Sequence, residues 1–138
     1  MELSVISHVE TANPLLGFEP DLFISASSFE SRATVIARML GESPARKVVF
    51  AYRENTKEFS RPENDRYFTE NKFSIFTYSQ SDIPDFHPVI GSPEKRNLKI
   101  LIDISCMPRR WYHGLFSYLH SGIHGMDKVE LRVLYIPS

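Results

Sequence analysis

Two segments of this chain share one design, and they constrain its fold more than any other feature. Residues 21–32 and 98–110 each contain an apolar run, then a turn rich in hydroxyl groups, then the start of a helical pattern that carries arginine. This order is typical of a parallel β-strand that leads through a short polar loop into a helix. Backbone N–H groups and the helix dipole favour an anion at such a loop. The two segments therefore predict a Rossmann-like domain that binds a phosphate-bearing ligand.

The rest of the chain alternates between the two kinds of pattern. Apolar spacing predicts helices from Phe29 to Leu40, over 62–71 with a Ser60–Glu63 capping box, and from Met107 to Leu119. Between 79 and 97 the prolines and the lack of apolar periodicity predict an irregular crossover. The predicted strands are 21–26, 47–52, 73–78, 98–104 and 129–136.

Strands separated by helical crossovers must run parallel, so the sequence predicts one α/β domain over residues 1–138 with a mainly parallel sheet of about five strands. Numbered from residue 21, the strands should lie in the order 3-2-1-4-5. Ligands of such sheets bind at the carboxyl ends of the strands, where the strand order reverses. Residues 1–20 are less regular, and an extra edge strand around Leu3 to Val9 is expected there.

Composition narrows the classes of function. The net charge of −1 and the scattered lysines and arginines argue against a general nucleic-acid surface. No apolar run approaches the roughly 20 residues that span a bilayer, so no membrane contact is expected. The single cysteine, Cys106, suits a reducing compartment, and no signal-peptide pattern is visible, so we expect a cytoplasmic protein.

The candidate site residues come from the two polar loops. Arginine can hold a phosphate bidentately, and a carboxylate can bind ribose hydroxyls or act as a base. Two arginines in the first turn of a helix oppose its dipole, and a bound anion would relieve that conflict. The candidate catalytic residues are Glu30 and Asp103, and the candidate ligand-binding or phosphate-binding residues are Ser25, Ser27, Ser28, Arg32, Ser105, Arg109 and Arg110.

Structural roles compete with these functional ones. Ser27 and Glu30 have the spacing of a capping box, and Ser105 with Pro108 could cap the next helix. Asp103 could also be neutralised by Arg32 or Arg109.

Other features carry less functional weight. Cys106 lacks the spacing of a phosphatase loop and is expected to be a small buried residue. Gly122 breaks the helix between His120 and His124, so no metal site is predicted. Trp111 is in phase with the core, and Gly114 is expected to allow close contact with the sheet. Classical dinucleotide, P-loop and hydrolase motifs are absent from the sequence.

One resemblance follows from the first segment. Asp21 to Ser25, followed by Arg32 and an amphipathic helix, resembles the opening of TIR domains over about twenty residues, and the second segment is partly similar to a TIR region whose helix carries tryptophan, here Trp111. The resemblance implies a nucleotide pocket in a signalling or defence protein. TIR enzymes that cleave NAD use a glutamate on that helix, whereas residues 109–120 contain no acidic residue.

The sequence thus predicts a domain that binds a nucleotide or another phosphate-bearing small molecule, with NAD as one candidate ligand and no resident cofactor. Two alternatives remain open. One is a hydrolase or transferase that acts on an N-glycosidic or phosphoester bond with Glu30 or Asp103. The other is a protein-interaction module that docks a partner or a second copy through the charged and aromatic residues 53–66.

Overall fold

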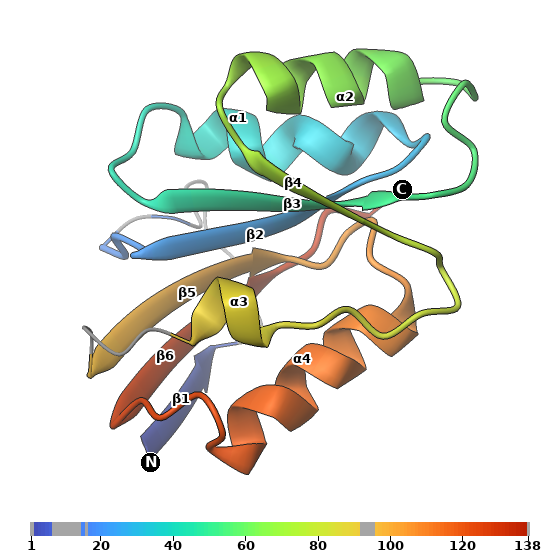
Figure 1. The fold of residues 1–138 in the computed structure, drawn as a ribbon. Coiled ribbons are helices and arrows are strands. Elements are labelled where there is room, and N and C mark those ends of the chain that lie inside the picture. Colours follow the sequence, from blue (N-terminus) through green and yellow to red (C-terminus); the bar gives the residue numbers. More distant parts are fainter. Residues whose placement is uncertain (1, 7–14, 16, 92–95, 138) are drawn as a thin grey trace.

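In the computed structural model, which describes residues 2–6, 15, 17–91 and 96–137, six parallel strands form one sheet with helices on both faces (Figure 1). The strands are β1 (Glu2–Ile6), β2 (Leu22–Ser27), β3 (Arg46–Tyr52), β4 (Ser74–Tyr78), β5 (Asn97–Asp103) and β6 (Lys128–Leu134). The helices are the 3₁₀ helix η1 (Ser31–Thr34) and the α-helices α1 (Val35–Leu40), α2 (Arg61–Glu70), α3 (His87–Ile90) and α4 (Arg109–Ser121).

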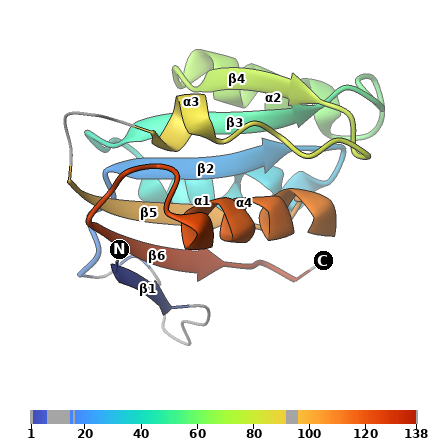
Figure 2. The ribbon, with the colours of Figure 1, turned by 60° about the horizontal axis from the view of Figure 1, so that its bottom comes forward.

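The strand order is β1-β6-β5-β2-β3-β4, and all pairs are parallel (Figure 2). The α/β class is confirmed, and the five strands from residue 22 onward lie in the predicted order. The count differs, because β1 adds a sixth strand beside β6. The expected edge strand is confirmed over residues 2–6, and residues 7–9 lie outside the described part of the chain.

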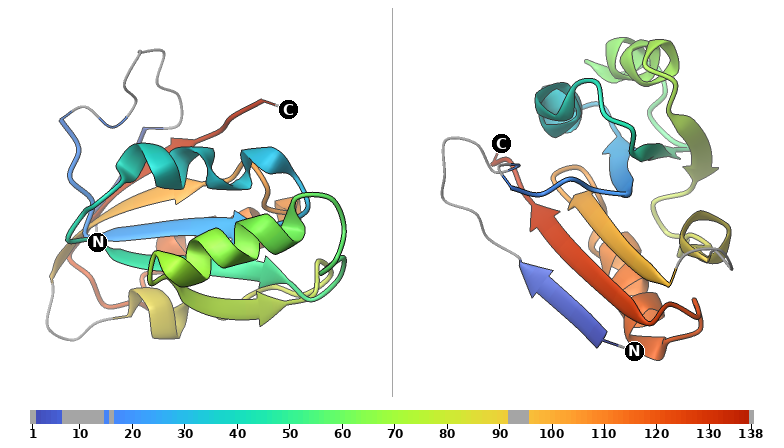
Figure 3. Two further views of the ribbon diagram at one scale, coloured as in Figure 1. Left: turned by 90° about the horizontal axis from the view of Figure 1, so that it is seen from above. Right: turned by 90° about the vertical axis from the view of Figure 1, so that its left-hand side faces the viewer.

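The order reverses between β2 and β5, which places the switch point where it was predicted. From β2 the chain moves outward to β3 and β4, and then returns to build β5 and β6 on the other side. Right-handed crossovers in opposite directions put their helices on opposite faces of the sheet. Accordingly α1 and α2 cover one face, as the left view of Figure 3 shows, and α3 and α4 cover the other (Figure 1).

Each face has its own core. Phe23, Val49 and Leu101 point toward α1 and α2 and pack with Ile36 and Phe68. On the other face Trp111, Leu115 and Leu119 of α4 pack against alternate residues of β2, β3 and β5, among them Ile24, Phe50 and Ile100. Trp111 is fully buried and touches the rings of Phe50 and Tyr52, so its predicted core position is confirmed.

Three local expectations were wrong. Ser60 precedes α2 but makes no side-chain capping bond, so the predicted capping box does not form. The crossover after β4 is irregular as far as Phe86 but then contains α3. A Cβ on Gly114 would lie 2.7 Å from Ile83 Cγ2, so this glycine makes room for the crossover rather than for the sheet.

Within the described ranges, no helix combines the length and the apolar character that crossing a bilayer requires.

Candidate functional site

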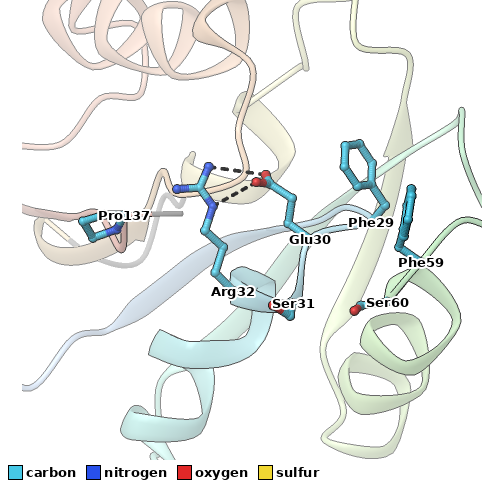
Figure 4. Close-up of a pocket in the computed structure, with 7 residues that line it drawn as sticks. All are labelled: Phe29, Glu30, Ser31, Arg32, Phe59, Ser60 and Pro137. Carbon is cyan, nitrogen blue, oxygen red and sulfur yellow. Dashed lines mark hydrogen bonds and ion pairs between the residues drawn. The ribbon is translucent and has the colours of Figure 1, made fainter.

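An open pocket of about 450 Å³ lies at the carboxyl edge of the sheet, next to the switch point (Figure 4). Three segments far apart in the sequence build it: the loop after β2, the loop before α2, and the chain after β6. Its lining residues are Phe29, Glu30, Ser31, Arg32, Phe59, Ser60 and Pro137. The carboxyl edge near the switch point is where ligands of open α/β sheets bind. Of the predicted site residues, Glu30 and Arg32 line this pocket.

Glu30 and Arg32 form a bidentate ion pair at the pocket wall. Arg32 Nε lies 3.2 Å from Glu30 Oε1, and Arg32 Nη2 lies 3.3 Å from Oε2. The Arg32 side chain is 17% exposed and the Glu30 side chain is 31% exposed, so the pair is partly shielded from solvent but faces the pocket. The carboxylate is therefore held in one orientation and stays accessible to a small molecule.

The same guanidinium holds the chain that follows β6. Arg32 Nη1 donates to the Ile136 carbonyl at 2.6 Å and to the Tyr135 hydroxyl at 3.3 Å, and the Tyr135 ring lies 5.3 Å from the guanidinium carbon. Through these bonds Arg32 positions Pro137 on the pocket wall. All of these acceptors except Glu30 are neutral, so an anionic ligand oxygen would be a stronger acceptor than they are.

Side chains of helix α2 hold the loop after β2 in place through hydrogen bonds. The Asn64 side chain is buried and donates to the carbonyls of Ser28 and Glu30, at 2.9 and 2.8 Å. Ser27 Oγ donates to Asp65 at 2.7 Å, and Asp65 accepts from Arg61. These bonds anchor the loop that carries Glu30 onto a helix some thirty-five residues later, which makes Asn64 a positioning residue for the pocket.

The second polar loop lies beside the first but does not line the pocket. Asp103 is 2% exposed, and its Oδ1 accepts from both the backbone N–H and the hydroxyl of Ser105. Ser105 Oγ in turn accepts from the Ile136 N–H at 2.8 Å. Burial raises the pKa of Asp103 to about 6, although the bonds from Ser105 oppose that rise. Asp103 is thus buried and is not part of the pocket lining.

Cys106 joins the two loops. Its side chain is hydrogen-bonded to Ser28, and its carbonyl accepts from the buried Tyr52 hydroxyl. Burial raises the pKa of the Cys106 thiol to about 11, so the sulfur stays neutral and unreactive at pH 7. The expectation of a small buried cysteine is confirmed.

The remaining candidates lie away from the pocket lining. Ser25 is buried within β2, and its hydroxyl has no hydrogen-bond partner among the described residues. Arg109 and Arg110 are exposed in the first turn of α4, at the same edge of the sheet. Their contact with an anion remains a prediction.

The capping roles proposed as alternatives were wrong. The first turn after β2 is the 3₁₀ helix η1, which begins at Ser31, and Glu30 rather than Ser27 precedes it. Neither η1 nor α4 has a side-chain capping bond, so the side chains of Glu30 and Ser105 do not cap these helices. Their side chains bond instead to Arg32 and to Asp103, which leaves the Glu30 carboxylate at the pocket.

Six pocket or positioning residues were missed as site residues: Phe29, Ser31, Phe59, Ser60, Asn64 and Pro137. The one available signal was the charged and aromatic segment 53–66, which was assigned to docking on composition alone. Part of that segment is internal, because Arg61 is only 3% exposed.

Both ring nitrogens of His124 have hydrogen-bond partners on the nearby backbone. One ring nitrogen faces the Leu119 carbonyl at 2.9 Å and the other accepts from the Met126 N–H at 3.0 Å. In the described part of the chain, no group of three or more metal-ligating side chains is placed to hold a metal ion.

No protein-family model, curated protein or solved structure matches this chain. The resemblance of residues 21–40 to TIR domains therefore stays a prediction, and the function is argued from the pocket itself.

Proposed function

We propose that this domain binds a nucleotide-class small molecule in the pocket between the loop after β2, the loop before α2 and the chain after β6. One observation carries the proposal: an open pocket of about 450 Å³ at the carboxyl edge has two phenyl rings on one side and the Glu30–Arg32 pair on the other (Figure 4). This volume falls in the range of small-molecule sites.

The polar wall matches the sugar and phosphate of such a ligand. A phosphate oxygen can replace the neutral Ile136 carbonyl on Arg32, because a charged acceptor forms the stronger bond with a guanidinium. Glu30 can accept hydrogen bonds from ribose hydroxyls while Arg32 holds it in place. Arg109 and Arg110 would add to phosphate binding where the ligand extends along the carboxyl edge toward α4.

Replacing Arg32 with alanine is expected to weaken the binding of AMP about 10- to 100-fold, the effect of losing a charge-assisted contact worth about 1.5–3 kcal/mol. Isothermal titration calorimetry with AMP and with ribose 5-phosphate measures this change. The control is Arg96→Ala, which removes the same charge at the amino edge of the sheet, where Arg96 pairs with Asp127 in an exposed ion pair. Equal affinities of the parent and Arg32→Ala, or no binding of either compound to the parent, would contradict the proposal.

A second candidate is hydrolysis of an N-glycosidic bond in the same pocket. It is favoured by the accessible Glu30 carboxylate, which lines the pocket while Asp103 does not. In NAD hydrolysis, water would attack the ribose C1′ carbon, the bond to the nicotinamide nitrogen would break, and Glu30 would take the proton of the water. Nicotinamide would leave as a neutral molecule.

Glu30→Gln tests this candidate cleanly because the Glu30 side chain makes no capping bond to a helix. Glutamine can still accept a bond from Arg32 but cannot take up a proton, so NAD turnover is expected to fall by more than about 100-fold while AMP affinity changes little. Mass spectrometry of released nicotinamide measures turnover. A variant as fast as the parent would show that Glu30 is structural, and a parent without turnover would leave binding alone as the function.

A further inference from the structure

Phe59 combines two unfavourable features at the rim of the pocket. The residue is 84% exposed, although phenylalanine ordinarily gains stability by burial. Its backbone has φ +46°, in the left-handed region that residues other than glycine, asparagine and aspartate rarely adopt. Strain of this kind costs of the order of 1–3 kcal/mol and tends to persist where function requires it.

The surrounding bonds hold Phe59 in this conformation. The Ser60 N–H donates to the Phe29 carbonyl at 3.0 Å, and the Arg61 N–H donates to the Glu58 carbonyl at 2.9 Å. The segment before α2 is therefore fastened directly to the loop after β2. Because the Arg61 side chain is also buried, the backbone on both sides of Phe59 has little freedom.

This backbone places the Phe59 ring beside Phe29. The ring centroids are 5.9 Å apart and the planes are inclined by 48°, so the two rings form an open angle rather than a closed stack (Figure 4). Despite this contact, Phe59 remains 84% exposed. A further planar group that packs on the exposed face of the Phe59 ring would account for this arrangement.

We propose that Phe59 is the base-recognition residue of the pocket: it stacks the planar ring of a nucleobase, with Phe29 as the second wall. This inference rests on the proposed nucleotide function and names the part of the ligand that the two rings select. The two charged residues of the pocket lining pair with each other, so the aromatic side offers a neutral apolar surface. Aromatic side chains stack every base, because every base has a π-face.

Three variants of the full chain separate stacking from other roles. Phe59→Gly fits the positive φ and removes the ring, Phe59→Leu keeps an apolar side chain without a plane, and Phe59→Trp enlarges the plane. We expect AMP affinity to fall about 10- to 100-fold in the glycine and leucine variants and to be kept or improved in the tryptophan variant. Ribose 5-phosphate, which has no base, should bind equally to the parent and all three variants.

Stability provides the fold control. Phe59→Gly is expected to melt at or above the temperature of the parent, because glycine accepts the left-handed backbone without strain. A loss of AMP binding in that variant is then not due to unfolding. Calorimetric titration with both probes and thermal melting followed by circular dichroism give these results.

The outcomes also separate this inference from the function on which it rests. If ribose 5-phosphate and AMP bind and Arg32→Ala weakens both, but the Phe59 variants bind AMP like the parent, nucleotide binding stands and the stacking role is overturned. Equal losses for both probes in the glycine variant would mean that Phe59 only shapes the pocket, which also overturns it. If the parent binds neither probe and sedimentation shows a dimer that Phe59→Gly dissociates, Phe59 belongs to an interface between copies and both proposals fail.

Discussion

Replacing Arg61 with alanine is expected to lower the free energy of unfolding by about 3 kcal/mol. The Arg61 guanidinium is buried and donates to three acceptors: Asp65 at 2.8 Å, the Glu54 carbonyl at 3.0 Å and the Tyr52 carbonyl at 2.7 Å. The variant leaves the Tyr52 carbonyl at the end of β3 and the Glu54 carbonyl just beyond it without this donor, and each lost charge-assisted bond contributes to the cost. Arg61→Lys should fall between the parent and alanine, because an ammonium cannot match the planar fork.

Urea denaturation followed by circular dichroism measures this loss. Arg66→Ala is the matched control, since Arg66 is exposed on the same helix and substitutions of that kind usually change stability by less than about 0.5 kcal/mol. Equal losses in the Arg61 and Arg66 variants would show that the buried network does not hold α2 against β3.

Replacing Asp103 with asparagine is expected to remove a decline in stability between pH 4 and pH 6. Burial raises the pKa of this carboxyl from 3.8 to about 6 in the folded protein. The protonated form is thus favoured by folding, so its stabilising contribution is complete below about pH 4 and is lost as the pH rises through about 6. A shift of about two pKa units corresponds to about 3 kcal/mol over that interval.

The diagnostic quantity is the slope of the unfolding free energy against pH. Asparagine also buries an amide, whose cost in stability does not depend on pH. Unfolding free energies of the parent and the variant, measured from pH 4 to pH 7, should diverge by about 3 kcal/mol in favour of the variant. Asp127→Asn is the control: Asp127 is exposed and Arg96 lowers its pKa, so the parental decline should remain. A parallel pair of curves for Asp103→Asn and the parent would contradict the assignment.

The strand order could be predicted because it depends on local signals and general rules. Residues 22–27, 48–52 and 100–103 are mostly apolar and are buried on both faces, as strands covered on both faces must be. The crossovers between them leave few parallel arrangements. The register and the side of β1 could not be predicted, because β1 pairs with a strand from the far end of the chain.

The site residues could be predicted only where they lie close together in one segment of the sequence. Glu30 and Arg32 lie two residues apart on the first polar loop, and both line the pocket. The Ser27 hydroxyl was predicted to bind a ligand or, as the alternative, to cap a helix, but it bonds to Asp65, thirty-eight positions later. Phe59 and Pro137 meet that loop only in the folded molecule, and nothing local in the sequence marks a phenylalanine with positive φ.

The position of β1 has a consequence for the order of events during synthesis. Glu2 pairs with Lys128, so β1 cannot pair with its neighbour in the sheet until β6 has been translated and has left the ribosome. Strands β2, β3 and β4 pair with sequence neighbours and can assemble long before that. A nascent chain from which β2, β3 and β4 have emerged is expected to hold a three-stranded sheet with β1 unpaired, and completing the sheet couples residues 2–6 to β6. Limited proteolysis of isolated chains that end before residue 128 or after residue 134 is expected to show protection of residues 2–6 only in the longer one.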